Sequence, residues 1–328
     1  MRHFCTYFDS NYLVRALALY RSLERHCPSF RLHVLCLDEK CHDIMKQCNL
    51  PNAVLIPMQE LESEYPQLPP CRANRSRIEY FYTCSPCLPL FVLTKNPAID
   101  MVTYLDADLY FFASPEPIFD ELRDASIGII EHKYAPCLSS FQTNGKYNVG
   151  WISFRNDSNG LACVRWWQER CIEWCYERNE NGKYGDQGYL NEWPERFQRV
   201  HVVQHKGANV APWNVANFAV TCRDEHLMVD EAPLLFFHFH GFKKLASGIY
   251  DSNLARSGAR LGPVLRERVY GAYIQELDRQ TIHGPPTATV RKASDRYGLF
   301  IRWLRTSFRI AATIFSGAYV VQYRGRFF

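Results

Sequence analysis

The sequence predicts an α/β protein with a mostly parallel central sheet, helices on both faces of that sheet, and a basic helical tail. Three observations lead to this prediction. Short apolar segments of strand length alternate with longer segments of helical periodicity. Such alternation favours parallel strands joined by crossover helices. The hydrophobic content of 47% and the charged content of 22% are those of a globular chain.

The first third of the chain predicts most of the sheet. Leu13, Leu17, Tyr20 and Leu23 recur at helical spacing, directly after a short apolar strand. Pro86 and Pro89 are expected to distort the helix predicted over residues 76–93. In chain order, strands are expected at residues 3–8, 32–37, 54–56 and in the run from 99 to 105, and helices at 12–26 and 76–93.

The middle of the chain continues the alternation of helices and strands. A helix-and-strand stretch is expected over residues 117–130, a strand over 147–154, and an amphipathic helix over 161–178. Asp186 is expected to cap the next helix, after a loop at 179–182. An apolar strand at 234–241 ends in two histidines and a glycine.

The tail differs in charge from the rest of the chain. Residues 285–328 carry eight basic residues and one acidic residue. We expect a main domain of residues 1–284, a linker at Gly284-Pro285-Pro286 and a separate tail. Residues 299–310 mix basic and aromatic side chains, which is typical of a helix lying in a membrane surface; a helix packed on the domain is the alternative. Nucleic acid is not an expected partner, because the basic residues do not continue into the main domain.

The sequence also predicts the compartment. It has no run of eighteen apolar residues and no apolar signal-peptide core at its N-terminus. We expect a cytoplasmic protein that touches the inner face of a membrane through its tail. Its thirteen cysteines are expected to be reduced, structural thiols.

The triplet Asp106-Ala107-Asp108 is the main candidate for chemistry. It follows an apolar strand, and residues two apart in an extended chain point to the same side. Two carboxylates on one side of a buried strand end are costly unless a positive charge joins them. A divalent metal that carries a diphosphate would supply this charge.

Four short motifs then occur in an order that resembles a known family. They are Tyr104-Leu105-Asp106-Ala107-Asp108, Asn148-Val149-Gly150, Asp186-Gln187-Gly188-Tyr189-Leu190-Asn191 and His238-Phe239-His240-Gly241. Over residues 3–250 the chain is similar to retaining glycosyltransferases of the glycogenin and bacterial lipooligosaccharide galactosyltransferase type (family 8). The resemblance implies a glycosyltransferase A fold and a metal-dependent hexosyltransferase of polysaccharide biosynthesis. Its donor would be a nucleotide sugar, UDP-linked, and its acceptor a saccharide or a lipid-linked sugar, with retention.

The resemblance implies that Asp106, Asp108 and His238 are the metal ligands. Carboxylates with an imidazole suit Mn²⁺, or Mg²⁺, which would be the cofactor. His238 stands three residues before Gly241, the spacing of the family's H-x-x-G motif. His240 is the competing candidate, because it would point to the same side of a strand. Alternatively, the two histidines only cap a buried strand.

The resemblance also implies the residues that hold the nucleotide. Asp9 would accept from the uracil imide, Asn11 would bind the ribose and Tyr12 would stack on the base. Asp9 or Ser10 could equally be an ordinary helix N-cap. Lys244 would contact the diphosphate, but Leu245-Ala246 replace the family's Pro-Trp, so Lys243 is an alternative. Arg75 and Arg77 either neutralise phosphate or begin a solvated helix. The nucleotide-binding set is Asp9, Asn11, Tyr12, Ala107 and Lys244.

The catalytic pair implied by the resemblance is Asp186 and Gln187. Asp186 would bind the donor hydroxyls, and Gln187 would lie near the anomeric carbon. An amide is a poor nucleophile, so we favour attack from the front face, with the departing phosphate accepting the acceptor's proton. The sugar and acceptor pocket would contain Asn148, Gly150, Trp213 and Asn214, with Val149 in place of the family's alanine.

Two other functions remain open from the sequence. A sugar-1-phosphate nucleotidyltransferase would need a glycine-rich phosphate loop after the first strand, and the residues from Phe8 to Asn11 provide none. A non-catalytic protein that binds a nucleotide or carbohydrate is the other alternative, although the candidate Asp, His and Gln set argues against it.

Overall fold

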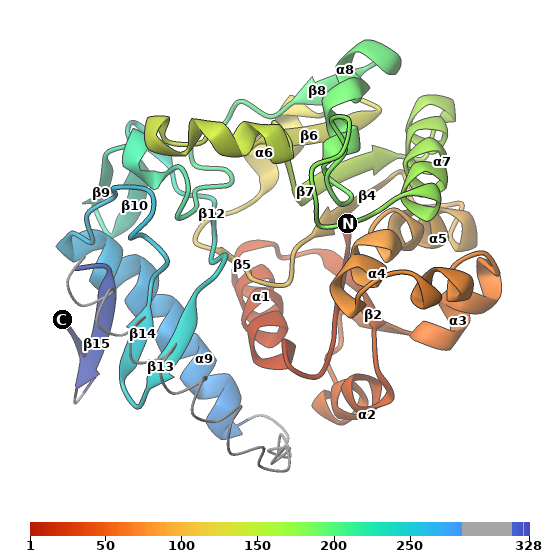
Figure 1. The fold of residues 1–328 in the computed structure, drawn as a ribbon. Coiled ribbons are helices and arrows are strands. Elements are labelled where there is room, and N and C mark those ends of the chain that lie inside the picture. The colour runs from red at the N-terminus through yellow and green to blue at the C-terminus, as the bar shows by residue number, and fades with distance from the viewer. Residues whose placement is uncertain (284–316, 324) are drawn as a thin grey trace.

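The protein is built on a seven-stranded sheet with the strand order β3-β2-β1-β4-β7-β6-β8 (Figure 1). This computed structural model describes residues 1–283, 317–323 and 325–328. The strands of this sheet are β1 (Arg2–Phe8), β2 (Phe30–Cys36), β3 (Ala53–Pro57), β4 (Met101–Leu105), β6 (Ile127–Glu131), β7 (Tyr147–Arg155) and β8 (Val200–Val202).

The sheet is mostly parallel, as the sequence predicts. β1 pairs in parallel with β2 and β4, β2 with β3, and β6 with β8. Only β7 runs the other way, between β4 and β6. Parallel strands end at one edge of a sheet. The residues that follow β1, β2 and β4 therefore gather at this edge, where open α/β sheets bind their ligands.

Two hydrophobic cores cover the two faces of the sheet. Neighbouring residues of β1 point into different cores, because side chains of a strand alternate between faces: Phe4 packs with α1, α2 and α6, and Cys5 packs with α3, α4, α5, α7 and α8. These helices are α1 (Leu13–His26), α2 (Glu39–Cys48), α3 (Met58–Glu64), α4 (Arg77–Cys84), α5 (Cys87–Lys95), α6 (Glu116–Glu121), α7 (Ser158–Glu173) and α8 (Trp193–Arg196). Short 3₁₀ segments are η1 (Pro69–Ala73), η2 (Pro136–Asn144), η3 (Gly188–Glu192) and η4 (Val215–Asn217).

Three predicted helices need correction. The helix expected over 76–93 is interrupted at Pro86, so α4 and α5 are separate. α7 ends at Glu173 and not at residue 178, because Trp174 is already extended. Asp186 does not cap a helix: η3 follows Gln187 and has no side-chain cap.

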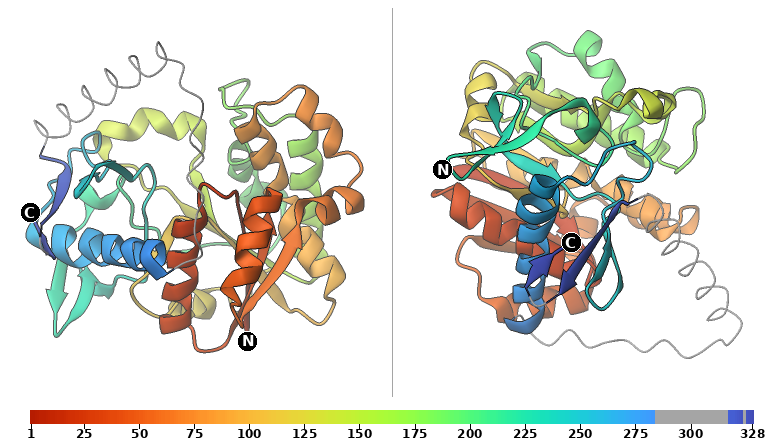
Figure 2. Two further views of the ribbon diagram at one scale, coloured as in Figure 1. Left: turned by 90° about the horizontal axis from the view of Figure 1, so that it is seen from below. Right: turned by 90° about the vertical axis from the view of Figure 1, so that its left-hand side faces the viewer.

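The C-terminal part forms a third core beside the sheet. It contains η5 (Val264–Tyr270), a π-helical segment, which continues into α9 (Gly271–His283), and α9 packs against α1 (Figure 2). Its strands form three small sheets. These are β5 (Leu109–Phe111) with β12 (Phe236–His238); β9 (Val220–Arg223), β10 (His226–Val229) and β11 (Ala232–Pro233); and β13 (Lys243–Ala246), β14 (Ile249–Asp251), β15 (Tyr319–Tyr323) and β16 (Arg326–Phe327).

The expected linker at 284–286 and the expected membrane helix at 299–310 lie outside the described residues. After them, β15 pairs antiparallel with β14, so the end of the predicted tail lies on the main body. No helix within the described ranges is long and apolar enough to cross a bilayer. The thirteen cysteines are all free thiols, as expected, and most of them are buried.

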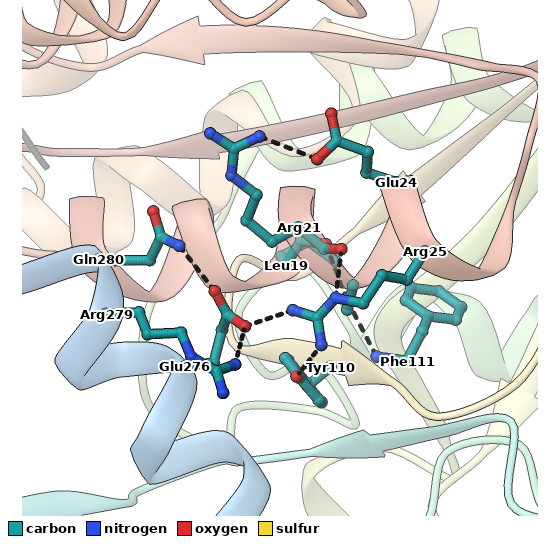
Figure 3. Close-up of polar contacts among 10 residues, drawn as sticks. Leu19, Arg21, Glu24, Arg25, Tyr110, Phe111, Glu276, Arg279 and Gln280 are labelled. Carbon is teal, nitrogen blue, oxygen red and sulfur yellow. Dashed lines mark hydrogen bonds and ion pairs between the residues drawn. The ribbon is translucent and has the colours of Figure 1, made fainter. Parts of the chain in front are cut away.

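A polar network joins α1, β5 and α9 (Figure 3). The carboxylate of Glu276, on α9, is only 3% exposed, and it forms an ion pair with Arg25 of α1. Arg25 also donates to the hydroxyl of Tyr110 on β5 at 2.9 Å. Gln280 donates to Glu276 at 2.6 Å, and Arg279 lies 3.4 Å from it. A buried carboxylate needs such partners, since leaving it without them is costly.

We expect Arg25→Gln to lower the free energy of unfolding by about 1–3 kcal/mol, because it removes a charge partner from the buried Glu276. This loss of stability is smaller than that for breaking a fully buried ion pair, because the Arg25 side chain is 44% exposed. Urea denaturation at pH 7 measures this. The matched control is Arg21→Gln, which removes only an exposed pair with Glu24. Equal losses for the two variants would contradict the role given to Glu276.

Candidate functional site

A cavity of about 760 Å³ opens at the carboxyl edge of the sheet. It is lined by residues that follow β1 and β4, by α4 and η2, and by the loops after β12 and β14. Its volume lies within the range of about 300–1,000 Å³ that is usual for small-molecule sites. The cavity therefore occupies the place that the parallel topology predicts for a ligand.

The acidic pair and His238 meet in this cavity. β5 begins directly after Asp108 and pairs with β12, so that Leu109 lies opposite His238. The Nε2 atom of His238 lies 3.0 Å from Asp108 Oδ1 and 3.6 Å from Asp106 Oδ2. The predicted convergence of these three groups is thus present in the structure, although they come from distant parts of the chain.

Burial and mutual electrostatic interaction shift the pKa values of Asp106, Asp108 and His238. The His238 side chain is 2% exposed. Burial alone would lower its pKa, but the charge of Asp108 and its hydrogen bond raise the pKa above its usual value. Burial acts upward on the pKa of Asp108, yet the nearby His238 lowers that pKa overall. The pKa of Asp106 is raised, first by burial and then by the carboxylate of Asp108, against the charge of His238. The carboxylates around this buried imidazole thus favour a positive charge.

These donors fit a divalent cation. Asp108, His238 and His240 each offer a ligand atom, and these atoms lie within 4.8 Å of one another. Asp106 adds a second carboxylate, and its Oδ1 accepts from Tyr104 at 2.9 Å. Oxygen and imidazole ligands together suit Mn²⁺ and similar ions. Both imidazoles are in reach, so His240 stays an alternative to His238.

The absence of a side chain at Gly150 leaves room for the imidazole of His238. A Cβ atom at residue 150 would lie 2.9 Å from His238 Cε1 and 2.5 Å from Asn148 Oδ1. Asn148 accepts from the backbone N–H of Gly150 at 3.1 Å, and its Nδ2 lies 3.2 Å from His132 Nε2. Asn148 lines the cavity, whereas Gly150 lies behind the imidazole.

The residues expected to hold the nucleoside, Asp9, Asn11 and Tyr12, line the cavity. Asp9 accepts from the backbone and side chain of Asn11 at 2.9 and 3.0 Å, and from Arg77 at 2.9 Å. The ring of Tyr12 is exposed, and the guanidinium of Arg15 lies 4.7 Å from its centre. Neither Asp9 nor Ser10 caps α1, whose N-cap is Tyr12, so the interpretation as a helix cap is wrong.

Asp186 and Gln187 also line the cavity. The Gln187 amide donates to the carbonyl of Asn144 at 2.8 Å, which joins it to the end of η2. Asp186 is buried, and this burial raises its pKa to about 7. The charge of Asp106 also raises that pKa, whereas a hydrogen bond with Ser85 acts in the opposite direction.

Other predicted residues divide between the cavity and the scaffold around it. Trp213 and Ala107 line the cavity, and the Trp213 ring lies 4.9 Å from that of His238. Asn214 is buried and lies outside the lining, where its side chain bonds the carbonyls of His132 and Asn209. Lys244 also lies outside the lining, with its Nζ 5.5 Å from the centre of the Tyr250 ring. Arg75 is a buried structural residue that donates to Thr83, while Arg77 lines the cavity.

Comparison with known proteins identifies two relatives in Bacillus subtilis (strain 168). YfnD is 34% identical over 243 residues, which cover 73% of this chain and 78% of YfnD. YfnF is 34% identical over 248 residues, which cover 73% of this chain and 81% of YfnF. The chain belongs to the YfnD and YfnF family. No model of a known protein family matches it.

Solved structures identify the fold of this YfnD-like chain. An active-site mutant of LgtC, a galactosyltransferase, matches with a TM-score of 0.50 and 19% identity, over 74% of this chain and 89% of the other. LgtC bound to donor and acceptor sugar analogues matches with a TM-score of 0.47 and 19% identity, over 73% and 87% of the two chains. The glycosyltransferase A fold implied by the resemblance is thereby confirmed.

His132 and Tyr134 are among the cavity residues of this YfnD-like protein that do not appear in the sequence prediction. His132 follows β6 directly, and its ring stacks on Tyr134 at 4.6 Å. Burial lowers the pKa of His132 to about 3, so this imidazole is neutral. β6 runs parallel to β4, so His132 stands at the same edge as Asp106. The rule that strand ends supply ligands could have identified it.

We expect Gly150→Ala to weaken Mn²⁺ binding at least tenfold, because the added methyl would displace the His238 ring or Asn148. Titration calorimetry with MnCl₂ measures this. Gly262→Ala is the matched control, since a Cβ there meets no atom within 4 Å. Unchanged affinity in Gly150→Ala would remove Gly150 from the support of the site.

The raised pKa of Asp186 predicts a pH-dependent cost to stability. Between about pH 4 and 7 the folded carboxyl keeps a proton that the unfolded one has lost, so stability falls as the pH rises through this window. Asp186→Asn removes this cost. Between pH 5 and pH 8, the free energy of unfolding of Asp186→Asn relative to that of wild type should therefore rise by about 2–3 kcal/mol.

Urea denaturation in the presence of EDTA, at both pH values, tests this expectation without bound metal. Asp43→Asn, an exposed substitution on α2, is the control. Parallel stability profiles for wild type and Asp186→Asn would show that Asp186 ionises as an ordinary carboxyl.

Proposed function

We propose that the protein is a metal-dependent glycosyltransferase. It would transfer a sugar from a nucleotide-sugar donor, UDP-linked, to a saccharide or lipid-linked acceptor, with retention. The observation that carries this proposal is the convergence of Asp106, Asp108 and His238 in one cavity of a glycosyltransferase A fold. The resemblance of four motifs in order supports the same activity.

Asp106, Asp108 and His238 would hold the divalent ion, Mn²⁺ or Mg²⁺, with His240 as the alternative imidazole ligand. The ion would act as a Lewis acid on the diphosphate of the donor. The protein's own contribution is to keep these ligands together: Gly150 leaves room for the imidazole, and Tyr104 orients Asp106 through its hydroxyl.

The nucleoside would lie against Asp9, Asn11 and Tyr12. The exposed Tyr12 ring offers a flat surface for the base, and Asp9 offers carboxylate oxygens for an N–H donor. Ala107, which stands between the two proposed ligand carboxylates in the sequence, also lines the cavity. Lys244 stays a prediction for the diphosphate, although it lies outside the cavity.

The sugar would lie between the acidic pair and Asp186. Asp186 and Asn148 would bind its hydroxyls, with Trp213 near the ring and with Gly150 and Asn214 supporting these contacts. Gln187 would stabilise positive charge at the anomeric carbon through its amide oxygen. Because an amide is a poor nucleophile, front-face attack is the retaining route that we favour.

Donor hydrolysis tests the proposed function. We expect the purified protein to release UDP from UDP-glucose or UDP-galactose with MnCl₂, and to lose about 100-fold or more of this rate in EDTA. Asp106→Asn and Asp108→Asn should lose about as much, whereas Asp43→Asn should not. Released UDP is measured by a coupled assay.

Other outcomes of this assay would favour the alternatives. Release of pyrophosphate from a nucleoside triphosphate and a sugar phosphate would indicate a nucleotidyltransferase. Tight metal-dependent binding of UDP-sugars without any turnover, with or without acceptors, would indicate a binding protein. Nuclear magnetic resonance of the first product tests retention at the anomeric carbon.

A further inference from the structure

The proposed donor, on which this inference rests, carries a diphosphate whose negative charge grows during transfer. The bond between the anomeric carbon and the phosphate oxygen breaks, and both electrons stay on that oxygen. The acceptor's hydroxyl oxygen forms the new bond to carbon, and its proton passes to the phosphate. A protein cation beside the departing diphosphate would stabilise this charge.

Most charged side chains around the cavity are acidic. The lining contains five carboxylates, Asp9, Asp106, Asp108, Glu177 and Asp186, but only two arginines, Arg77 and Arg256. Arg77 is already engaged, since its Nη2 lies 2.9 Å from Asp9 Oδ2 and 3.6 Å from Asp38 Oδ2. It neutralises the nucleoside end of the cavity and is not free for a diphosphate.

Three other cations, Lys244, Arg15 and Lys243, do not line the cavity. Lys244 lies outside the lining, against the ring of Tyr250. Arg15 donates to the carbonyl of Phe242 and covers Tyr12, and it does not line the cavity either. Lys243 is close enough for its charge to contribute to the lowered pKa of His240, after burial and His238, but it too lies outside the lining.

Arg256 is different. It is exposed and lines the cavity, and its side chain has no hydrogen-bond or ion-pair partner among the residues that the structure describes. It lies in the loop after β14. Asn253 anchors this loop by donating to the carbonyl of His240 at 3.1 Å, and Cys137 of η2 contacts the carbonyl of Ser257 at 3.3 Å. The loop is therefore held against a candidate metal ligand at one end and against η2 at the other.

We infer that Arg256 binds the diphosphate of the donor, in the role that the sequence resemblance gives to Lys244. A guanidinium can donate two parallel hydrogen bonds to phosphate oxygens, which an ammonium cannot do in the same fixed geometry. With the metal ligands on the β4 side and Arg256 on the loop after β14, the diphosphate would be held between two parts of the chain. The anchored loop makes Arg256 a positioning group for the leaving phosphate.

Nucleotide binding tests this inference without relying on turnover. The probe is the diphosphate among UDP, GDP, CDP and ADP that wild type binds best with MnCl₂, and the matching monophosphate is the comparison. We expect Arg256→Gln to weaken diphosphate binding about 10- to 100-fold, the usual effect of losing hydrogen bonds to a charged group. Monophosphate binding should change less than about threefold. Arg256→Lys should recover part of the loss.

Arg260→Gln is the matched control, an exposed arginine outside this cavity, and it should bind like wild type. Lys243→Gln and Lys244→Gln represent the rival assignments. If either of them loses diphosphate affinity while Arg256→Gln keeps it, the assignment of Arg256 is overturned. An equal loss of monophosphate and diphosphate binding in Arg256→Gln also overturns it. If wild type binds none of the four diphosphates, the proposed function fails first, and this inference fails with it.

Discussion

The pairing of β5 with β12 is the constraint on which the site depends. The acidic triplet follows β4 of the main sheet, whereas His238 belongs to the C-terminal part, and this short antiparallel ladder brings them together. Its register places Leu109 opposite His238, and a shift by one residue would turn the imidazole to the other side. The hydrogen bond from the N–H of His238 to the carbonyl of Val210 holds the same strand from its other side. A few backbone hydrogen bonds thus decide where a buried charge cluster forms.

The rest of the structure supports this ladder from two directions. On the sheet side, Gly150 of β7 lies directly behind the imidazole and donates to the Asn148 side chain, so this strand limits the depth of the site. On the other side, Glu276 and Arg25 fasten α9 to α1 and reach Tyr110, which is one of the β5 residues. The same short strand therefore supports both the cluster of Asp106, Asp108 and His238 and the network between helices. Strand β5 therefore contributes both to the stability of the protein and to the geometry of the site.

Much of this arrangement could be predicted from the sequence, for identifiable reasons. Strand and helix periodicity predicted the parallel sheet, and the order of four short motifs, which resembles a known family, pointed to Asp106, Asp108, His238, Asp186 and Gln187, which all line one cavity. The failures have physical causes as well. The cap predicted at Asp186 rests on local propensity, but burial next to the acidic pair places this carboxyl in the site. The role of Lys244 stays a prediction; its position along β13, against Tyr250, depends on how β13 pairs with β14. No local pattern could have revealed Arg256, since its place depends on a loop anchored by Asn253.

The last strands of the chain have a practical meaning for anyone who wishes to shorten the protein. Helix α9 ends at His283, and after residues 284–316 the described chain resumes at Gly317, just before β15, the neighbour of β14. Stopping the polypeptide after α9 would uncover the hydrogen-bonding edge of β14, the strand that leads into the loop of Asn253 and Arg256, and bare edges invite aggregation. Keeping β15 in place would spare that edge. Engineering of this terminus is therefore a question of preserving β15.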